Sequence, residues 1–81
     1  MADPADIEAL ALLRLRDPRG FDLAYRRHAA NLRGFLRRMT RNDDLADDLL
    51  QLTFLRLAER GPELRADSDL PAWLFTVARN A

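Results

Sequence analysis

The sequence predicts an all-α fold, a compact bundle of about four helices in a single domain over residues 1–81. Apolar residues recur three and four positions apart in four separate segments, which is typical of helices that bury one face. Residues that cap helices precede these segments, and proline or glycine separates them. A chain this short buries only ~60% of the surface of its unfolded form, so we expect one small core.

The first helix is expected to begin after Asp3, with Pro4 in its first turn, and to run to about Arg16. Its apolar stripe is predicted to contain Ile7, Leu10, Ala11 and Leu15. The stretch Asp17-Pro18-Arg19-Gly20 is expected to end this helix and to separate it from the next.

The second helix, from Phe21 to about Thr40, has the clearest amphipathic pattern. Its predicted buried arc contains Ala24, Tyr25, His28, Leu32, Phe35, Leu36 and Met39. Its arginines fall outside that arc, namely Arg26, Arg27, Arg33, Arg37 and Arg38. The pattern leaves two interpretations open: a solvated surface whose stems cover apolar neighbours, or a surface that faces a partner or phosphate.

The third helix is expected from Asp43 or Asp44 to about Arg60, where Gly61-Pro62 ends it. Its predicted core arc contains Leu45, Ala46, Leu49, Leu50, Thr53 and Leu57.

A second face of the third helix carries Leu52 and Leu55 on nearly the opposite side, beside Asp48 and Gln51. Apolar anchors inside a polar frame are typical of a specific protein interface. The alternative is that another helix of the chain covers these two leucines, and periodicity alone does not separate the two.

Residues 61–69 are expected to form a loop, longer than the usual connection between helices. Ser68 or Asp69 can cap the fourth helix, which is expected to begin near Leu70 with Pro71 in its first turn.

The fourth helix is predicted to bury Leu70, Leu74, Val77 and Ala81, with Trp73 and Ala78 at the margins. Phe75 and Arg79 are four residues apart, and they are expected on the side away from the core, beside Thr76 and Asn80. Such a group can stack on unpaired bases, hold a phosphate and contact a base edge. The alternative is that Phe75 packs under the loop or against the first helix.

The net charge of zero conceals a polarity, since residues 1–41 carry +4 and residues 42–81 carry −4. A neutral protein is not typical of a free-standing duplex-DNA binder, so a nucleic-acid function must be local or assisted. The chain has no cysteine, no run of apolar residues long enough to cross a bilayer and no signal peptide, and we expect it to be cytoplasmic.

Catalysis is not predicted. His28 lies at the centre of an apolar arc, which favours a buried, hydrogen-bonded histidine over a catalytic base. The third helix begins with four acids, Asp43, Asp44, Asp47 and Asp48, but they lack the alternating ligands and central glycine of a calcium loop. No metal site or cofactor is expected.

Three motifs resemble region 2 of extracytoplasmic-function (ECF) sigma factors, the bacterial factors that direct RNA polymerase to promoters. They are Phe21-x-x-x-Tyr25, then Ala46-Asp47-Asp48-Leu49-x-Gln51-x-x-Phe54, then Trp73-Leu74-x-x-x-Ala78-x-Asn80. Their order and spacing agree with the family over roughly residues 7–81.

The resemblance implies that the third helix binds the clamp-helix coiled coil of the polymerase β′ subunit through Asp48, Gln51, Leu52 and Leu55. Asp48 would accept charge-assisted hydrogen bonds from arginines of that subunit. The family usually has an acid where Leu52 stands, which leaves two interpretations open: a more apolar contact with the polymerase, or a surface suited to another partner.

The resemblance also implies promoter binding. The loop matching Leu64 to Ser68, including Arg65, Asp67 and Ser68, would cradle a base flipped out of the −10 element. The fourth helix would contact the non-template single strand through Arg79 and Asn80, to which helical spacing adds Phe75 and Thr76 as neighbours on the same side. Binding would offset the cost of unpairing without catalysis.

Such factors usually carry a second domain for the −35 element, so the chain is expected to be a fragment of a longer factor that an anti-sigma factor also binds. The alternative function is a sigma-like interaction module that binds an anti-sigma factor without reading DNA.

Overall fold

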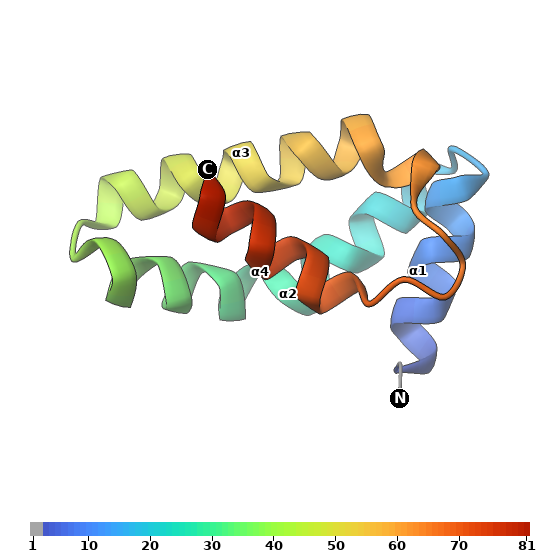
Figure 1. Cartoon of the computed structure of the whole chain (residues 1–81), viewed down its shortest axis with the longest axis horizontal. Coiled ribbons are helices and arrows are strands. Elements are labelled where there is room, and N and C mark those ends of the chain that lie inside the picture. The colour runs from blue at the N-terminus through green and yellow to red at the C-terminus, as the bar shows by residue number, and fades with distance from the viewer. Residues whose placement is uncertain (1–2) are drawn as a thin grey trace.

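The computed structural model describes residues 3–81, which form four α-helices and confirm the all-α prediction (Figure 1). The helices are α1 (Pro4–Arg14), α2 (Pro18–Thr40), α3 (Asp43–Arg60) and α4 (Leu70–Asn80). A short 3₁₀ helix, η1 (Gly61–Glu63), opens the segment that the sequence predicted as a plain loop.

The long axis of the molecule is an antiparallel pair formed by α2 and α3, which a tight turn joins at one end (Figure 1). α4 lies across both helices, while α1 packs against α2 at the far end of the pair. The chain leaving η1 runs back beside α1 before it enters α4, so α1 supports the loop that precedes α4 (Figure 1).

Each helix begins at a residue whose side chain accepts a hydrogen bond from a backbone amide of the first turn. The four capping residues are Asp3, Asp17, Asn42 and Asp69. The predicted start of the second helix at Phe21 is therefore wrong by three residues. Asp17 caps the N-terminus of α2, and Pro18 is well suited to the first turn of a helix. These two residues therefore begin α2 and do not only end α1.

The predicted stripe of the first helix is wrong in phase. Ile7 is 50% exposed and Leu15 is 76% exposed, and Ala11 is exposed as well. The residues of α1 that the fold buries are Asp6, Ala9, Leu10 and Leu13. The helix is rotated because the Asp6 carboxylate points inward, toward a partner on α2.

The core otherwise follows the predicted arcs, with corrections at their edges. Tyr25, Met39 and Leu45 were expected inside, yet each remains nearly half exposed. Phe54 was left out of the predicted arc of α3 and is buried, while Ala78 replaces Val77 at the buried centre of α4. The buried apolar residues are Ala9, Leu10, Leu13, Ala24, Leu32, Leu36, Ala46, Leu50, Phe54, Leu57, Leu70, Leu74 and Ala78.

Candidate functional site

The outer face of α3 carries the four residues predicted to bind a protein partner. Asp48 and Gln51 are exposed, Leu55 is 56% exposed, and Leu52 is half-buried. The alternative that another helix of the chain covers Leu55 is therefore wrong within residues 3–81. No hydrogen bond or ion pair among these described residues engages the side chain of Asp48 or Gln51, so this face presents an apolar anchor between two polar groups.

Tyr25 of α2 contacts α3 and is partly exposed. Its ring packs edge-on against Phe54, with 4.8 Å between the centroids, and Phe54 directly precedes Leu55 in α3. Phe21 also contacts Phe54 edge-on at 5.9 Å. Sequence reasoning placed Tyr25 inside the core, and the structure instead leaves it 45% exposed.

The loop before α4 brings Arg65, Asp67 and Ser68 into one turn. The amide of Arg65 donates to Ser68 Oγ at 3.0 Å, and the amide of Ser68 donates to the carbonyl of Arg65 at 3.0 Å. The guanidinium of Arg65 pairs with Asp67 at 3.1 Å. Arg14 of α1 donates to the carbonyl of Leu64 at 2.7 Å, so α1 fixes the start of this turn.

A hollow of about 380 Å³ lies where the loop passes the start of α1. Its lining includes Asp3 and Asp6 from α1 and Asp67, Ser68 and Asp69 from the loop. Carboxylate oxygens accept hydrogen bonds and repel phosphate, so the hollow suits the amino groups of a base better than a phosphodiester.

The four residues predicted on α4 separate into two sets. Thr76, Arg79 and Asn80 are exposed, whereas Phe75 is half-buried. The ring of Phe75 packs edge-on against Phe35 of α2, with 5.2 Å between centroids. The expectation that Phe75 lies away from the core is therefore wrong, and its partner is α2 instead of the loop or the first helix.

A groove of about 250 Å³ lies between α3 and α4. The sequence analysis did not identify the residues of α3 that line it. Arg56 and Arg60 of α3 form one wall; Trp73, Thr76 and Asn80 of α4 contribute to the other. The signal was present, since Arg56 and Arg60 are four residues apart and share a side of α3. What the sequence did not give is that α4 lies on that side.

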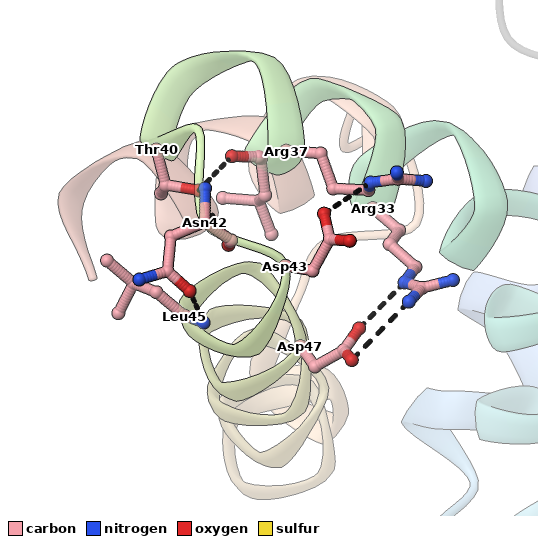
Figure 2. A network of polar contacts seen from close by, with 8 residues as sticks. Arg33, Arg37, Thr40, Asn42, Asp43, Leu45 and Asp47 are labelled. Atoms are coloured by element: carbon pink, nitrogen blue, oxygen red, sulfur yellow. Dashed lines mark hydrogen bonds and ion pairs between the residues drawn. The ribbon is translucent and has the colours of Figure 1, made fainter.

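The arginine side chains of α2 fit neither of the two open interpretations, because most of them pair with carboxylates of the same chain. Figure 2 shows Arg33 and Arg37 reaching the aspartates at the start of α3. Arg33 Nε donates to Asp47 at 2.7 Å, and Arg37 Nε donates to Asp43 at 2.9 Å. The hydrogen bond to Asp47 raises the pKa of Arg33 above its ordinary value. The positive first half of the sequence is thus partly neutralised by the negative second half.

His28 is buried and hydrogen-bonded, as predicted. Its Nε2 donates to Asp6 Oδ1 at 2.6 Å, and the same oxygen accepts from Arg27 Nε at 3.2 Å. This buried cluster holds α1 on α2. Within residues 3–81 no group of three or more potential ligands from histidine, cysteine, aspartate and glutamate is placed to hold a metal ion. No helix in the same range is long and apolar enough to cross a membrane.

Comparison with known proteins gives a consistent result. The model of the family described as sigma-70 region 2 matches residues 24–81. The RNA polymerase sigma factor CarQ of Myxococcus xanthus is 43% identical over 61 residues, covering 75% of this chain and 35% of that protein. The ECF RNA polymerase sigma factor EcfG of Rhodopseudomonas palustris (strain TIE-1) is 46% identical over 50 residues, covering 62% of this chain and 28% of that protein.

A third relative, the ECF RNA polymerase sigma factor SigL of Mycobacterium tuberculosis, is 47% identical over 58 residues, covering 69% of this chain and 32% of that protein. The chain therefore spans about a third of the length of the curated relatives it matches. No solved structure matches it significantly.

Proposed function

Because this chain belongs to the sigma-70 region 2 family, as a region 2 domain of the ECF type, we propose that it docks on bacterial RNA polymerase and captures the −10 element of the promoter as single-stranded DNA. Its role in transcription initiation is binding, and the chemistry stays with the polymerase. This activity belongs in the bacterial cytoplasm, where the polymerase acts.

The docking surface is the outer face of α3. Asp48 and Gln51 supply unengaged polar groups, and Leu52 and Leu55 supply apolar area between them. The exposed Leu55 is the observation that carries the proposal, since an unpartnered leucine within a polar frame marks a protein contact. The occupant we propose is the clamp-helix coiled coil of the β′ subunit, with Asp48 accepting from its arginines.

The DNA surface is the loop and the exposed side of α4. A base extruded from the −10 element fits the hollow beside Asp67 and Ser68, whose acceptors match the amino groups of adenine, cytosine or guanine. Thr76, Arg79 and Asn80 contact the non-template strand next to it. Phe75, half-buried against Phe35, offers at most a ring edge to a base, so its main effect is to orient α4.

Calorimetric titration of this chain with a purified β′ clamp-helix fragment tests the docking surface. Asp48→Ala and Leu52→Arg should each remove most of the affinity, because the first deletes a charged acceptor and the second places a cation in an apolar contact. Leu15→Arg is the matched control, since Leu15 is an exposed leucine that follows the last residue of α1, outside the proposed surface, and the affinity of this variant should stay at the wild-type value.

A folded wild-type chain that shows no heat of binding to the β′ fragment would overturn the docking proposal. Tight binding to an anti-sigma factor in that same preparation would then support the alternative, a sigma-like interaction module without a promoter function.

A further inference from the structure

The hollow beside the loop has two walls that come from distant parts of the sequence. Asp3 and Asp6 at the start of α1 line one side, and Asp67 and Ser68 of the loop line the other. Because the chain does not join the two walls directly, the width of the hollow depends on the contacts that hold the loop beside α1.

One hydrogen bond ties the loop to α1. Arg14 Nη1 donates to the carbonyl oxygen of Leu64 at 2.7 Å, across 50 positions of the sequence. Within residues 3–81, the other hydrogen bonds and ion pairs of residues 64–69 stay inside that segment or reach only η1 and the first turn of α4. A guanidinium donor makes the bond to Leu64 charge-assisted, which is stronger than a bond between neutral groups.

The backbone that carries this arginine is held from two sides. A Cβ added to Gly20 of α2 would lie 2.6 Å from the backbone nitrogen of Leu13, so the first turn of α2 touches the backbone of α1 directly. A Cβ added to Gly61 would lie 3.0 Å from Leu13 Cδ2, so η1 packs closely on the same turn of α1. Since Arg14 follows Leu13, its side chain extends from a fixed position toward the loop.

The rest of the loop has few restraints that come from outside it. Its turn closes on itself through the two hydrogen bonds between Arg65 and Ser68. The side chain of Leu64 packs against the core, but an apolar contact is not directional, whereas a hydrogen bond prefers one line of approach. The bond from Arg14 is therefore the contact that fixes the direction in which the loop leaves η1.

We propose that Arg14 is a positioning residue for the base-binding hollow. Its hydrogen bond to Leu64 sets the path of the loop, and thereby sets the distance between the carboxylates of α1 and those of the loop. Arg14 does not line the hollow, and it lies roughly 12 Å along α1 from Asp6, so it acts without touching the base. The proposal rests on the proposed function and makes α1 part of base selection.

The decisive variant is Arg14→Gln, and its matched control is Arg16→Gln. Arg16 is exposed two residues further on, and its side chain makes no hydrogen bond or ion pair within residues 3–81. Backbone NMR relaxation of the DNA-free chain measures the loop itself. In Arg14→Gln the order parameters of residues 65–68 should fall from about 0.85, typical of rigid backbone, to below about 0.6. The control should keep the wild-type values.

The affinities for two DNA single strands of about 12 nucleotides measure the hollow. One strand contains only adenine and cytosine, whose amino groups suit carboxylate acceptors, and the other contains only thymine, which has no amino group. The wild-type chain should prefer the first strand about tenfold, the size of one base contact. Arg14→Gln should reduce this preference to about twofold and leave the affinity for the thymine strand unchanged.

Arg14→Lys separates positioning from the charge of the last turn of α1, where any cation stabilises the helix dipole. Lysine keeps the charge and a donor that reaches for the same carbonyl, so it should recover most of the order of the loop and most of the base preference. Melting followed by circular dichroism should stay within about 4 °C of the wild-type chain for all three variants, because Arg14 and Arg16 are exposed.

A loop that stays ordered in Arg14→Gln would overturn the proposal, whatever the strands show. Equal losses of affinity for both strands would also overturn it, since a general loss of charge explains that result, and so would an equal loss of preference in Arg16→Gln. If the loop of Arg14→Gln loosens while the wild-type chain binds both strands equally, the role of Arg14 in placing the loop is supported and the base-capture part of the proposed function falls.

Discussion

The arginines of α2 and those of α3 differ in what they meet. On α2, Arg33 and Arg37 reach across to aspartates at the start of α3, and Arg27 reaches the buried Asp6 of α1. On α3, Arg56 and Arg60 face a groove with no carboxylate in its lining. The same residue type therefore serves to join helices in one region and leaves positive charge on the surface in the other.

This difference shows how a neutral chain can still present positive charge at particular places on its surface. Six of the thirteen arginines pair with carboxylates in the part of the chain that the structure describes, and such pairs exert little field beyond the Debye length of about 8 Å at physiological salt. The arginines without an ion pair in the described part of the chain lie in several places, among them Arg38 and Arg41 near the turn between α2 and α3, and Arg56 and Arg60 beside α4. Net charge is thus a poor guide to the local charge that a partner would meet on a domain this small.

The largest loss of stability is expected at the buried cluster, where Asp6 meets His28 and Arg27. Asp6→Ala removes the acceptor that serves both His28 and the partly exposed Arg27, and leaving His28 buried without it should lower the free energy of unfolding by about 3 kcal/mol. Urea denaturation at low temperature measures the loss. Asp6→Asn keeps an acceptor oxygen and should lose less.

Asp22→Ala is the control for this prediction, because Asp22 pairs with Arg26 on the exposed side of α2 and its loss should cost less than about 1 kcal/mol. If Asp6→Ala were no more destabilising than Asp22→Ala, the buried cluster would not be what holds α1 on α2.

A smaller contribution to stability is expected from the ion pair between Arg33 and Asp47, which Figure 2 shows. A double-mutant cycle with Arg33→Gln and Asp47→Asn should give a coupling of about 0.5 kcal/mol at low salt, because both side chains are nearly half exposed. The coupling should shrink in about 1 M salt, where screening is strong.

Arg56→Gln provides the contrast. Since Arg56 has no described partner, its substitution should change the free energy of unfolding by no more than about 0.5 kcal/mol. A loss as large as that of Asp6→Ala would mean that Arg56 holds the fold together, and the contrast between α2 and α3 would fail.

Local signals predicted the helices well, and contacts distant in sequence decided what was missed. Asp17-Pro18 and Asp69 act through neighbours within three residues, so the breaks between helices were visible in the sequence. The rotation of α1 was not, because it depends on Asp6 meeting His28, which is 22 residues away. Asp6 lies outside the predicted apolar stripe of the first helix, so nothing in the sequence indicated that its side chain is buried.

The candidate site divides in the same way. The outer face of α3 was predicted because Leu55 and Gln51 lie on one helix, where spacing fixes the face. The orientation of Phe75 depends on Phe35 of another helix, and the groove requires Arg56 and Trp73 to meet across two helices. Helical periodicity places residues on faces, but it does not say which faces of different helices come together.

The smallest effect on stability is expected at Asp17. Its ion pair with Arg19 forms within one helical turn, so it tests whether such a local pair behaves like the ion pairs between helices. The side chain and amide of Arg19 donate hydrogen bonds to Asp17, and they lower its pKa from 3.8 to about 2. A folded-state pKa below the unfolded value means that the stabilisation is complete above pH 3.8 and is lost as the pH falls through about 2. Carboxyl-carbon NMR titration should show Asp17 titrating at the low end of this window. Arg19→Gln should move its pKa back toward 3.8 and flatten the decline of the melting temperature between those two pH values. If Asp17 titrated near 3.8 in the wild-type chain, solvent would outweigh the geometry of the pair, and the pairs of Arg33 and Arg37, also partly exposed, would be expected to weaken in the same way.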